Sequence, residues 1–146
     1  MNERGNSTNE EIRHIMIVDD EDDHHLITRM MLKRSGFGGR LSTFQDPLEA
    51  LLHLRTCADR PDLLLVDINM PATDGFEFLR HCQEEDLIRP EATTVVMCSS
   101  SNRPMDMQLA EQQAVVHEYI EKPLTPDHFL RIAGDHRVRH QDPPSE

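Results

Sequence analysis

Three aspartates in this sequence stand directly after short runs of apolar residues. Asp19 and Asp20 follow Ile15 to Val18, and Asp67 follows Leu63 to Val66. Because burying a charge is costly, we expect each aspartate just outside the core, at the end of a strand. A carboxylate held rigidly in such a position can attack phosphorus and form an aspartyl phosphate. We predict Asp67 as this nucleophile, since its strand is expected to be central.

A hydroxyl group and an ammonium group stand at two further strand ends. Ser99 follows the mostly apolar run 94–98, and Lys122-Pro123 follows the short run 118–120. Binding groups collect at the carboxyl ends of parallel strands, so these side chains are expected to converge with the aspartates. Each pair of like charges at ~4 Å costs roughly 4 kcal/mol at an effective dielectric of ~20. Three carboxylates therefore need cations, and oxygen ligands of this kind favour Mg²⁺ beside Lys122.

The elements that position these residues alternate along the chain. Apolar runs predict strands at 15–18, 41–44, 63–66, 94–98 and 118–120, and amphipathic stretches predict helices at 24–34, 47–56, 75–85, 103–113 and 126–135. Continuous apolar runs suit parallel strands that are covered on both faces. Helix starts are indicated by Asp46-Pro47, Asp74 and Thr125-Pro126, and Gly36 ends the first helix. The pattern predicts a single α/β domain, a doubly wound (βα)5 sheet.

Length and charge narrow the class of protein. The chain of 146 residues is long enough for one domain with a proper core. Its formal net charge of −12 argues against nucleic-acid binding, and no apolar stretch reaches the ~20 residues of a membrane span. The three cysteines lack metal-ligand spacing, which indicates reduced thiols in a cytoplasmic protein. We expect a flexible segment over 1–12, the domain over 13–135 and a short tail over 136–146.

Four segments of this sequence together resemble the receiver domains of two-component response regulators. They are, in order, IMIVDDE, LLLVDINMPATDGFEFL, VVMCSS and YIEKPL, and the resemblance covers residues 13–135. It implies a flavodoxin-like sheet with the strand order 2-1-3-4-5. It also implies a partner, either a sensor histidine kinase or a histidine phosphotransfer protein, whose phosphohistidine supplies the phosphoryl group.

The resemblance also implies a role for individual residues. Asp67 would accept the phosphoryl group, Asp20 would bind Mg²⁺ directly and Asp19 would bind it through water. Asn69 would offer its backbone carbonyl to the metal. The remaining expectations are that Ser99 binds the phosphoryl group, that Lys122 pairs with it across a cis Lys122-Pro123 bond, and that Tyr119 swings inward when the hydroxyl moves. Within the triple serine 99–101 we prefer Ser99, because it directly follows the apolar run.

Some residues depart from the family pattern or allow a simpler interpretation. Val115 stands where family members usually have glycine, and a β-branched residue disfavours positive φ, so we expect a different turn there. The acidic run 19–23 could be only a solvated helix start. His24 and His25 point ~100° apart on a helix, so we expect surface or helix-cap residues rather than metal ligands. Cys98 is expected to be an inert buried thiol.

We therefore expect a stand-alone response regulator, which accepts phosphate on Asp67 and signals by contact with a target protein. It would catalyse only its own phosphorylation and dephosphorylation, so it is not classed as an enzyme. One alternative is a receiver-like interaction module that never carries phosphate. A weaker alternative is an aspartate-nucleophile phosphatase, which would need a second aspartate where this chain has Asn69.

Overall fold

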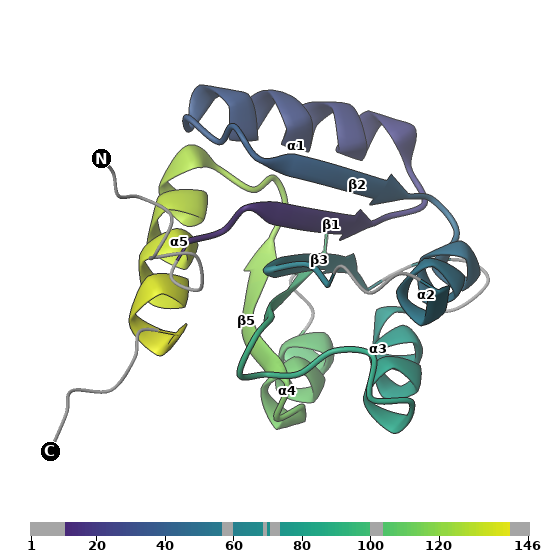
Figure 1. Ribbon diagram of the computed structural model, residues 1–146. Coiled ribbons are helices and arrows are strands. Elements are labelled where there is room, and N and C mark those ends of the chain that lie inside the picture. Colours follow the sequence, from purple (N-terminus) through teal and green to yellow (C-terminus); the bar gives the residue numbers. More distant parts are fainter. Residues whose placement is uncertain (1–10, 57–59, 69, 71–73, 100–103, 141–146) are drawn as a thin grey trace, which may run out of the picture.

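The computed structural model describes residues 11–56, 60–68, 70, 74–99 and 104–140. Within these ranges the strands are β1 (His14–Val18), β2 (Arg40–Phe44), β3 (Leu63–Asp67), β4 (Thr94–Ser99) and β5 (Val116–Glu121). The helices are α1 (Asp22–Arg34), α2 (Pro47–Thr56), α3 (Gly75–Glu84), α4 (Pro104–Gln112) and α5 (Pro126–His140). All paired strands are parallel, and their order is β2-β1-β3-β4-β5 (Figure 1). This confirms the predicted doubly wound α/β sheet.

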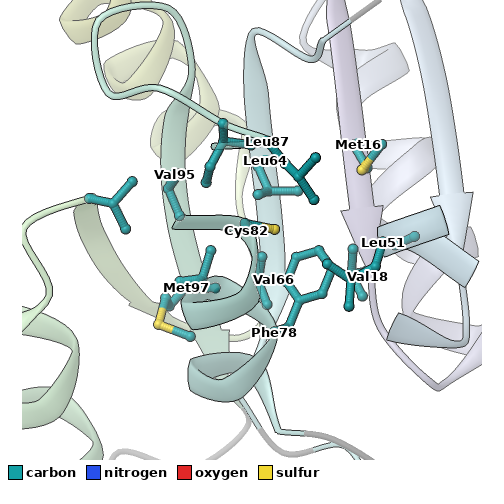
Figure 2. Close-up of a cluster of buried hydrophobic side chains, with 14 of the residues drawn as sticks. Met16, Val18, Leu51, Leu64, Val66, Phe78, Cys82, Leu87, Val95 and Met97 are labelled. Atoms are coloured by element: carbon teal, nitrogen blue, oxygen red, sulfur yellow. The ribbon is translucent and has the colours of Figure 1, made fainter. Parts of the chain in front are cut away.

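The two faces of the sheet bury alternate side chains of the same strands. Met16, Leu64 and Val95 belong to a core cluster with residues of α2, α3 and α4, part of which Figure 2 shows. Their chain neighbours Ile15 and Leu63 belong to a second cluster, together with residues of α1 and α5. Both faces of each central strand are therefore buried, which explains why the strand sequences are continuous apolar runs.

The strand registers bring four strand ends to the same edge of the sheet. Val18 of β1 pairs with Val66 of β3, and Asp67 of β3 pairs with Cys98 of β4. The last residue of β4, Ser99, pairs with Glu121 of β5. The residues at or just after these ends therefore face one another across the carboxyl edge of the sheet.

Side-chain caps fix the starts of three helices where the sequence predicts them. The Asp46 carboxylate accepts from the Leu48 N–H at 2.9 Å, and the Asp74 carboxylate accepts from the Glu77 N–H at 2.8 Å. The Thr125 hydroxyl oxygen accepts from the backbone N–H of His128, at 3.1 Å. Such caps satisfy backbone donors that have no partner within the helix.

The last helix is longer than the sequence pattern predicts. We expected it to end at residue 135 and a tail to follow, but α5 continues to His140. The reason is His136, which is fully buried and hydrogen-bonded through Nδ1 to the Thr94 hydroxyl at 2.7 Å. This contact attaches the helix to the sheet beyond residue 135. Residues 141–146 of the expected tail lie outside the described ranges, as do residues 1–10 of the N-terminal segment.

The turn before β5 avoids a left-handed residue, as expected from Val115. Among the described non-glycine residues only Asp86 has a positive φ. The Val116 N–H donates to the Gln113 carbonyl at 3.0 Å, and the Val115 side chain is buried in the core beside α4. A valine is therefore accommodated in this turn as a packing residue.

None of the helices in the described ranges is long and apolar enough to cross a membrane.

Candidate functional site

Three carboxylates meet at the carboxyl edge of the sheet. One carboxylate oxygen each from Asp19, Asp20 and Asp67 lies within 4.8 Å of the other two. Asp19 is 4% exposed and Asp67 is 6% exposed, whereas Asp20 is only partly buried. Negative charges this close repel one another strongly in a poorly solvated site. The structure thus places together the aspartates that the sequence singles out at the ends of two strands.

Asp19 is held by hydrogen bonds to its side chain and to its backbone. Its carboxylate accepts from the Glu21 N–H at 3.0 Å and from the Lys122 ammonium at 2.5 Å. Its backbone carbonyl accepts from His25 Nε2 at 2.7 Å, and its N–H donates to the Phe44 carbonyl at 3.0 Å. These contacts fix the position of Asp19 and the orientation of its carboxylate. Asp20 is less buried and is therefore more accessible to solvent.

Asp67 ends β3, and backbone hydrogen bonds hold Ile68 and Gly75 close to the sheet. The Ile68 N–H donates to the Cys98 carbonyl at 2.9 Å, and the Gly75 N–H donates to the Ile68 carbonyl at 2.9 Å. A Cβ atom at Gly75 would lie 2.5 Å from the Asp67 carbonyl oxygen, so a side chain cannot be accommodated there. Glycine therefore allows α3 to begin directly against the backbone of Asp67.

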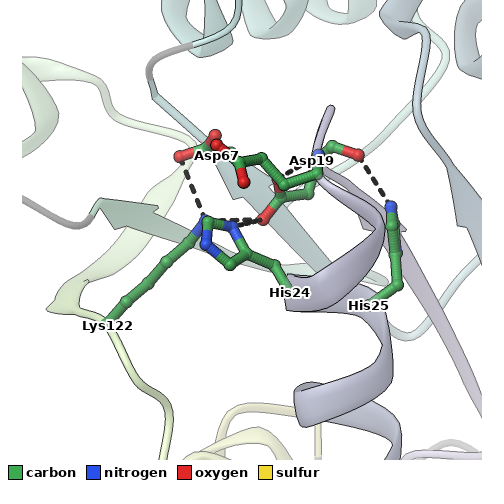
Figure 3. A network of polar contacts seen from close by, with 6 residues as sticks. Asp19, His24, His25, Asp67 and Lys122 are labelled. Atoms are coloured by element: carbon green, nitrogen blue, oxygen red, sulfur yellow. Dashed lines mark hydrogen bonds and ion pairs between the residues drawn. The ribbon is translucent and has the colours of Figure 1, made fainter.

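Lys122 brings a positive charge into this group of carboxylates. Its Nζ lies 2.5 Å from Asp19 Oδ2 and 3.4 Å from Asp67 Oδ1. Figure 3 shows Lys122 joined to both carboxylates. Its backbone N–H donates to the Ser99 carbonyl at 2.7 Å, and the expected cis Lys122-Pro123 bond is present. Three carboxylates against one ammonium group leave a formal excess of negative charge, and this oxygen-rich site suits a divalent cation.

The other predicted site residues are placed differently. Ser99 is fully buried as the last residue of β4. Tyr119 lies on β5, is partly buried and packs against the core cluster that α2, α3 and α4 share with the sheet. Asn69 lies outside the described residues, as do Ser100 and Ser101, so its expected metal contact stays a prediction.

The interpretation of His25 as a surface or cap residue was wrong, and the partly exposed His24 makes contacts that the sequence did not predict. His25 is 6% exposed and hydrogen-bonded to the Asp19 carbonyl. His24 Nδ1 lies 3.0 Å from Asp19 Oδ2 and 2.7 Å from Lys122 Nζ. Helical spacing could have identified the burial of His25, because it lies two turns before the buried Leu32. No sequence signal indicated the His24 contact with a lysine that follows it so far along the chain.

An apolar cavity of about 210 Å³ adjoins the charged groups. Ile17, Leu65, Cys98 and Leu124 line it together with Asp19, His24, Asp67 and Lys122. Burial raises the pKa of the Cys98 thiol to about 12, so this cysteine is an inert wall residue, as expected. Apolar walls exclude water and strengthen the electrostatic interactions of the charged groups beside them.

Known proteins are similar to this chain in amino-acid sequence. The family model for the response regulator receiver domain matches residues 15–133. The transcriptional regulatory protein CseB of Streptomyces coelicolor is 31% identical over 110 residues, which are 75% of this chain and 43% of CseB. The probable methanogenesis regulatory protein FilR2 of Methanothrix harundinacea is 30% identical over 125 residues, 83% of this chain and 79% of FilR2. The chain therefore spans less than half the length of CseB.

Solved structures agree with the fold. A two-component response regulator from Cytophaga hutchinsonii superposes with a TM-score of 0.78 at 22% identity, covering 86% of this chain and 97% of the other. The Mn²⁺-bound form of the response regulator Rcp1 superposes with a TM-score of 0.65 at 25% identity, covering 84% and 90%. With its strand order, its acidic edge and this match across most of its length, the chain belongs to the response regulator receiver domain family of two-component signalling.

Proposed function

We propose that this chain is a Mg²⁺-dependent phosphoacceptor, and that Asp67 receives a phosphoryl group from a phosphohistidine of a partner protein. One observation carries the proposal. Lys122 Nζ lies between Asp19 and Asp67, where three carboxylates from two strand ends come within 4.8 Å of one another. An ordinary structural ion pair needs one carboxylate for each ammonium group, so the surplus of negative charge calls for a second cation.

The donors present fit a divalent metal ion. Asp19, Asp20 and Asp67 offer only oxygen ligands, which suits Mg²⁺, and the related Rcp1 has been solved in a Mn²⁺-bound form. Asp20 and Asp67 would hold the ion directly and Asp19 through water, with the Asn69 carbonyl as a further ligand. When bound, the metal would neutralise the phosphoryl oxygens that otherwise repel the carboxylate nucleophile.

The protein's own groups account for the remaining steps of transfer. A carboxylate oxygen of Asp67 attacks phosphorus, and the bond between phosphorus and the histidine nitrogen breaks, its electron pair staying on nitrogen. With a proton on its other ring nitrogen, the partner's imidazole leaves as a neutral group. Lys122 would shift from Asp19 toward the new phosphoryl oxygens and bind one of them. The Ser99 hydroxyl would donate to another, since Ser99 ends the strand next to β3. Positioning and electrostatic stabilisation thus supply the catalysis.

The surface beside the site supports docking of a protein donor. Leu26, Ile27 and Met30 of α1 are 58%, 50% and 50% exposed. They belong to the same helix as His24, and Ile27 also lines the apolar cavity next to Asp67. Exposed apolar side chains grouped beside a reactive group are typical of a protein–protein interface. A histidine kinase or a histidine phosphotransfer protein is the partner that this arrangement favours.

Tyr119 would carry the signal away from the site. It lies on β5 and packs against the core cluster that includes Ala110 of α4, and its strand position pairs with Met97 of β4. Movement of the Ser99 hydroxyl toward a phosphoryl group would let the Tyr119 ring turn inward, and the surface of α4, β5 and α5 would change. Phosphorylation in this scheme shifts an existing equilibrium between two surface conformations.

The direct test is intact mass spectrometry after incubation with Mg²⁺ and acetyl phosphate. We expect the mass of one added phosphoryl group, which is absent with a chelator and absent in Asp67→Asn. The matched control is Asp62→Asn, since Asp62 lies at the amino edge of the sheet and accepts from the backbone N–H groups of Arg13 and His14. Asp62→Asn should be phosphorylated like the wild type.

The same experiment separates the other function classes. No added mass with acetyl phosphate or with any phosphohistidine donor would favour the interaction module and contradict the proposal. Steady release of phosphate from many small esters would favour the phosphatase. Phosphorylation that persists in Asp67→Asn would place the acceptor on another residue.

A further inference from the structure

The Lys122 ammonium group has three acceptors around it. Asp19 Oδ2 lies at 2.5 Å, His24 Nδ1 at 2.7 Å and Asp67 Oδ1 at 3.4 Å. A lysine ammonium has three N–H donors, so each donor can be assigned to one acceptor. Figure 3 shows the Lys122 side chain extending toward the site from the chain just after β5, and the imidazole extending from the first turn of α1.

The contact with lysine fixes the state of the imidazole. An ammonium group has no lone pair, so His24 Nδ1 must accept the hydrogen bond. In this hydrogen bond Nδ1 carries no proton, and Nε2 is the ring nitrogen that can donate. Nδ1 therefore cannot donate to Asp19 Oδ2, which lies 3.0 Å away. Instead, Nδ1 and Oδ2 both accept from the Lys122 ammonium, which holds the two acceptors close together.

The three acceptors are not placed evenly around the lysine. Asp19 and His24 both come from the segment that leaves β1 and enters α1, and both are nearer to Nζ than Asp67 is. Two of the three hydrogen bonds therefore hold the ammonium on the α1 side of the site. The side chains of Lys122 and Asp19 are only 15% and 5% exposed, so water competes weakly for these bonds.

We propose that His24 is a positioning residue that keeps Lys122 on Asp19 while no metal is bound, and that it thereby weakens Mg²⁺ binding. The inference rests on the proposed function. Lys122 must leave Asp19 when a divalent cation occupies the acidic pair, because like charges repel. On leaving, Lys122 gives up its hydrogen bond to His24. The imidazole thus makes the shift of Lys122 toward Asp67 depend on the metal.

The first test measures Mg²⁺ affinity by titration calorimetry. His24→Leu removes the acceptor, and His24→Asn places an amide oxygen close to the position of Nδ1. We expect His24→Leu to bind Mg²⁺ about threefold to tenfold more tightly than the wild type, which corresponds to the net contribution of one typical hydrogen bond. His24→Asn should stay within about twofold of the wild type. The matched control His81→Leu, which removes an imidazole from the last turn of α3, should also match the wild type.

The second test observes the lysine itself in metal-free protein. ¹⁵N NMR of the lysine ammonium groups should show a slowly exchanging Lys122 signal, because all three of its protons are hydrogen-bonded. We expect this signal in the wild type and in His24→Asn, and its loss in His24→Leu. A structural role of His24 in packing α1 would not restore the signal in His24→Asn.

Clear results would overturn the inference. Equal Mg²⁺ affinity of His24→Leu and the wild type would contradict it, as would weaker binding by His24→Leu. Tightening in His24→Asn as large as in His24→Leu would show that the ring acts by its size. If the wild type binds no Mg²⁺ and takes no phosphoryl group, the proposed function fails, and the NMR signal alone then decides whether His24 holds Lys122.

Discussion

The two edges of the sheet both bury polar side chains, but they satisfy them in different ways. At the amino edge, Asp62 accepts from the backbone N–H groups of Arg13 and His14 at 2.9 and 3.0 Å. Thr93 donates to the Pro61 carbonyl at 2.6 Å, also at this edge. At the carboxyl edge, Asp19 and Asp67 instead share one lysine and lie close to Asp20.

This difference separates groups that hold the fold together from groups that act. The hydrogen bonds of Asp62 and Thr93 at the amino edge join a side chain to backbone groups, which stabilises a fixed structure at little electrostatic cost. At the carboxyl edge, like charges lie close together. They serve a purpose only when a cation binds to them or when they take part in phosphoryl transfer. We therefore expect substitutions at the amino edge to destabilise the protein, and loss of a carboxylate at the other edge to do the opposite.

The largest expected effect is that of the metal on stability. Since the carboxyl edge carries surplus negative charge only in the folded chain, Mg²⁺ should bind the folded state and raise the free energy of unfolding. At a concentration 100 times its dissociation constant the gain is about 2.7 kcal/mol. Urea unfolding with Mg²⁺ and with a chelator measures this gain, and Asp20→Asn should lose most of it. An equal gain in Asp20→Asn would mean that the ion acts elsewhere.

The next largest effect concerns the bond between sheet and last helix, at the start of β4. Thr94 and His136 are both fully buried, and their hydrogen bond is 2.7 Å long. Thr94→Val keeps the shape of the side chain but removes the hydroxyl that is hydrogen-bonded to the buried His136 imidazole. This loss should lower the free energy of unfolding by about 2 kcal/mol. Urea unfolding measures the loss. Thr43→Val on the edge strand β2 is the control, with an expected change below about 0.5 kcal/mol.

One substitution made at both edges gives the sharpest comparison. Asp67→Asn removes a carboxylate that faces two like charges and one ammonium, so without Mg²⁺ it should raise the free energy of unfolding by about 1 kcal/mol. Asp62→Asn keeps an acceptor for its two backbone donors but weakens both bonds, and should lower stability by about 0.5–1 kcal/mol. Unfolding of both variants in the presence of a chelator tests the opposite signs. A loss of stability in both would mean that the two edges do not differ.

The sequence was sufficient for the fold and for the convergence of the charged residues. Continuous apolar runs such as Leu63 to Val66 suit strands that are covered on both faces, as β3 is. Parallel strands of similar length end at one edge, so residues that directly follow them, such as Asp19 and Lys122, must meet. Both inferences use chain direction and periodicity, which are properties of the sequence itself.

The direction and reach of single side chains could not be predicted in the same way. His24 contacts Lys122 because of where the first turn of α1 lies above the sheet, which depends on how α1 packs and not on its periodicity. The continuation of α5 to His140 likewise depends on the Thr94–His136 bond between distant parts of the chain. Long-range contacts between polar side chains leave no repeating pattern in a sequence.

The smallest expected effect is the pH dependence contributed by the amino edge. His14 has a lowered pKa, first because of burial and then because of the nearby Arg40 guanidinium, relative to its ordinary value of 6.5. Its Nε2 lies 2.8 Å from Ser42 Oγ, and its Nδ1 lies 3.4 Å from an Arg40 nitrogen, which can only donate. The folded chain therefore disfavours protonation of His14, in agreement with the Arg40 contact, in which Nδ1 must accept.

The sign of this effect follows from proton binding in the two states. Below pH 6.5 the unfolded chain protonates His14 more readily than the folded chain does, so the free energy of unfolding falls as the pH falls through 6.5 toward the lowered pKa. His14→Gln keeps a polar group near Ser42 but does not titrate. Urea unfolding at pH 5.5 and 7.5 should therefore show a smaller loss of stability in His14→Gln than in the wild type. An identical loss in both proteins would assign the acid sensitivity to other groups, and the carboxylates of the opposite edge would be the next to test.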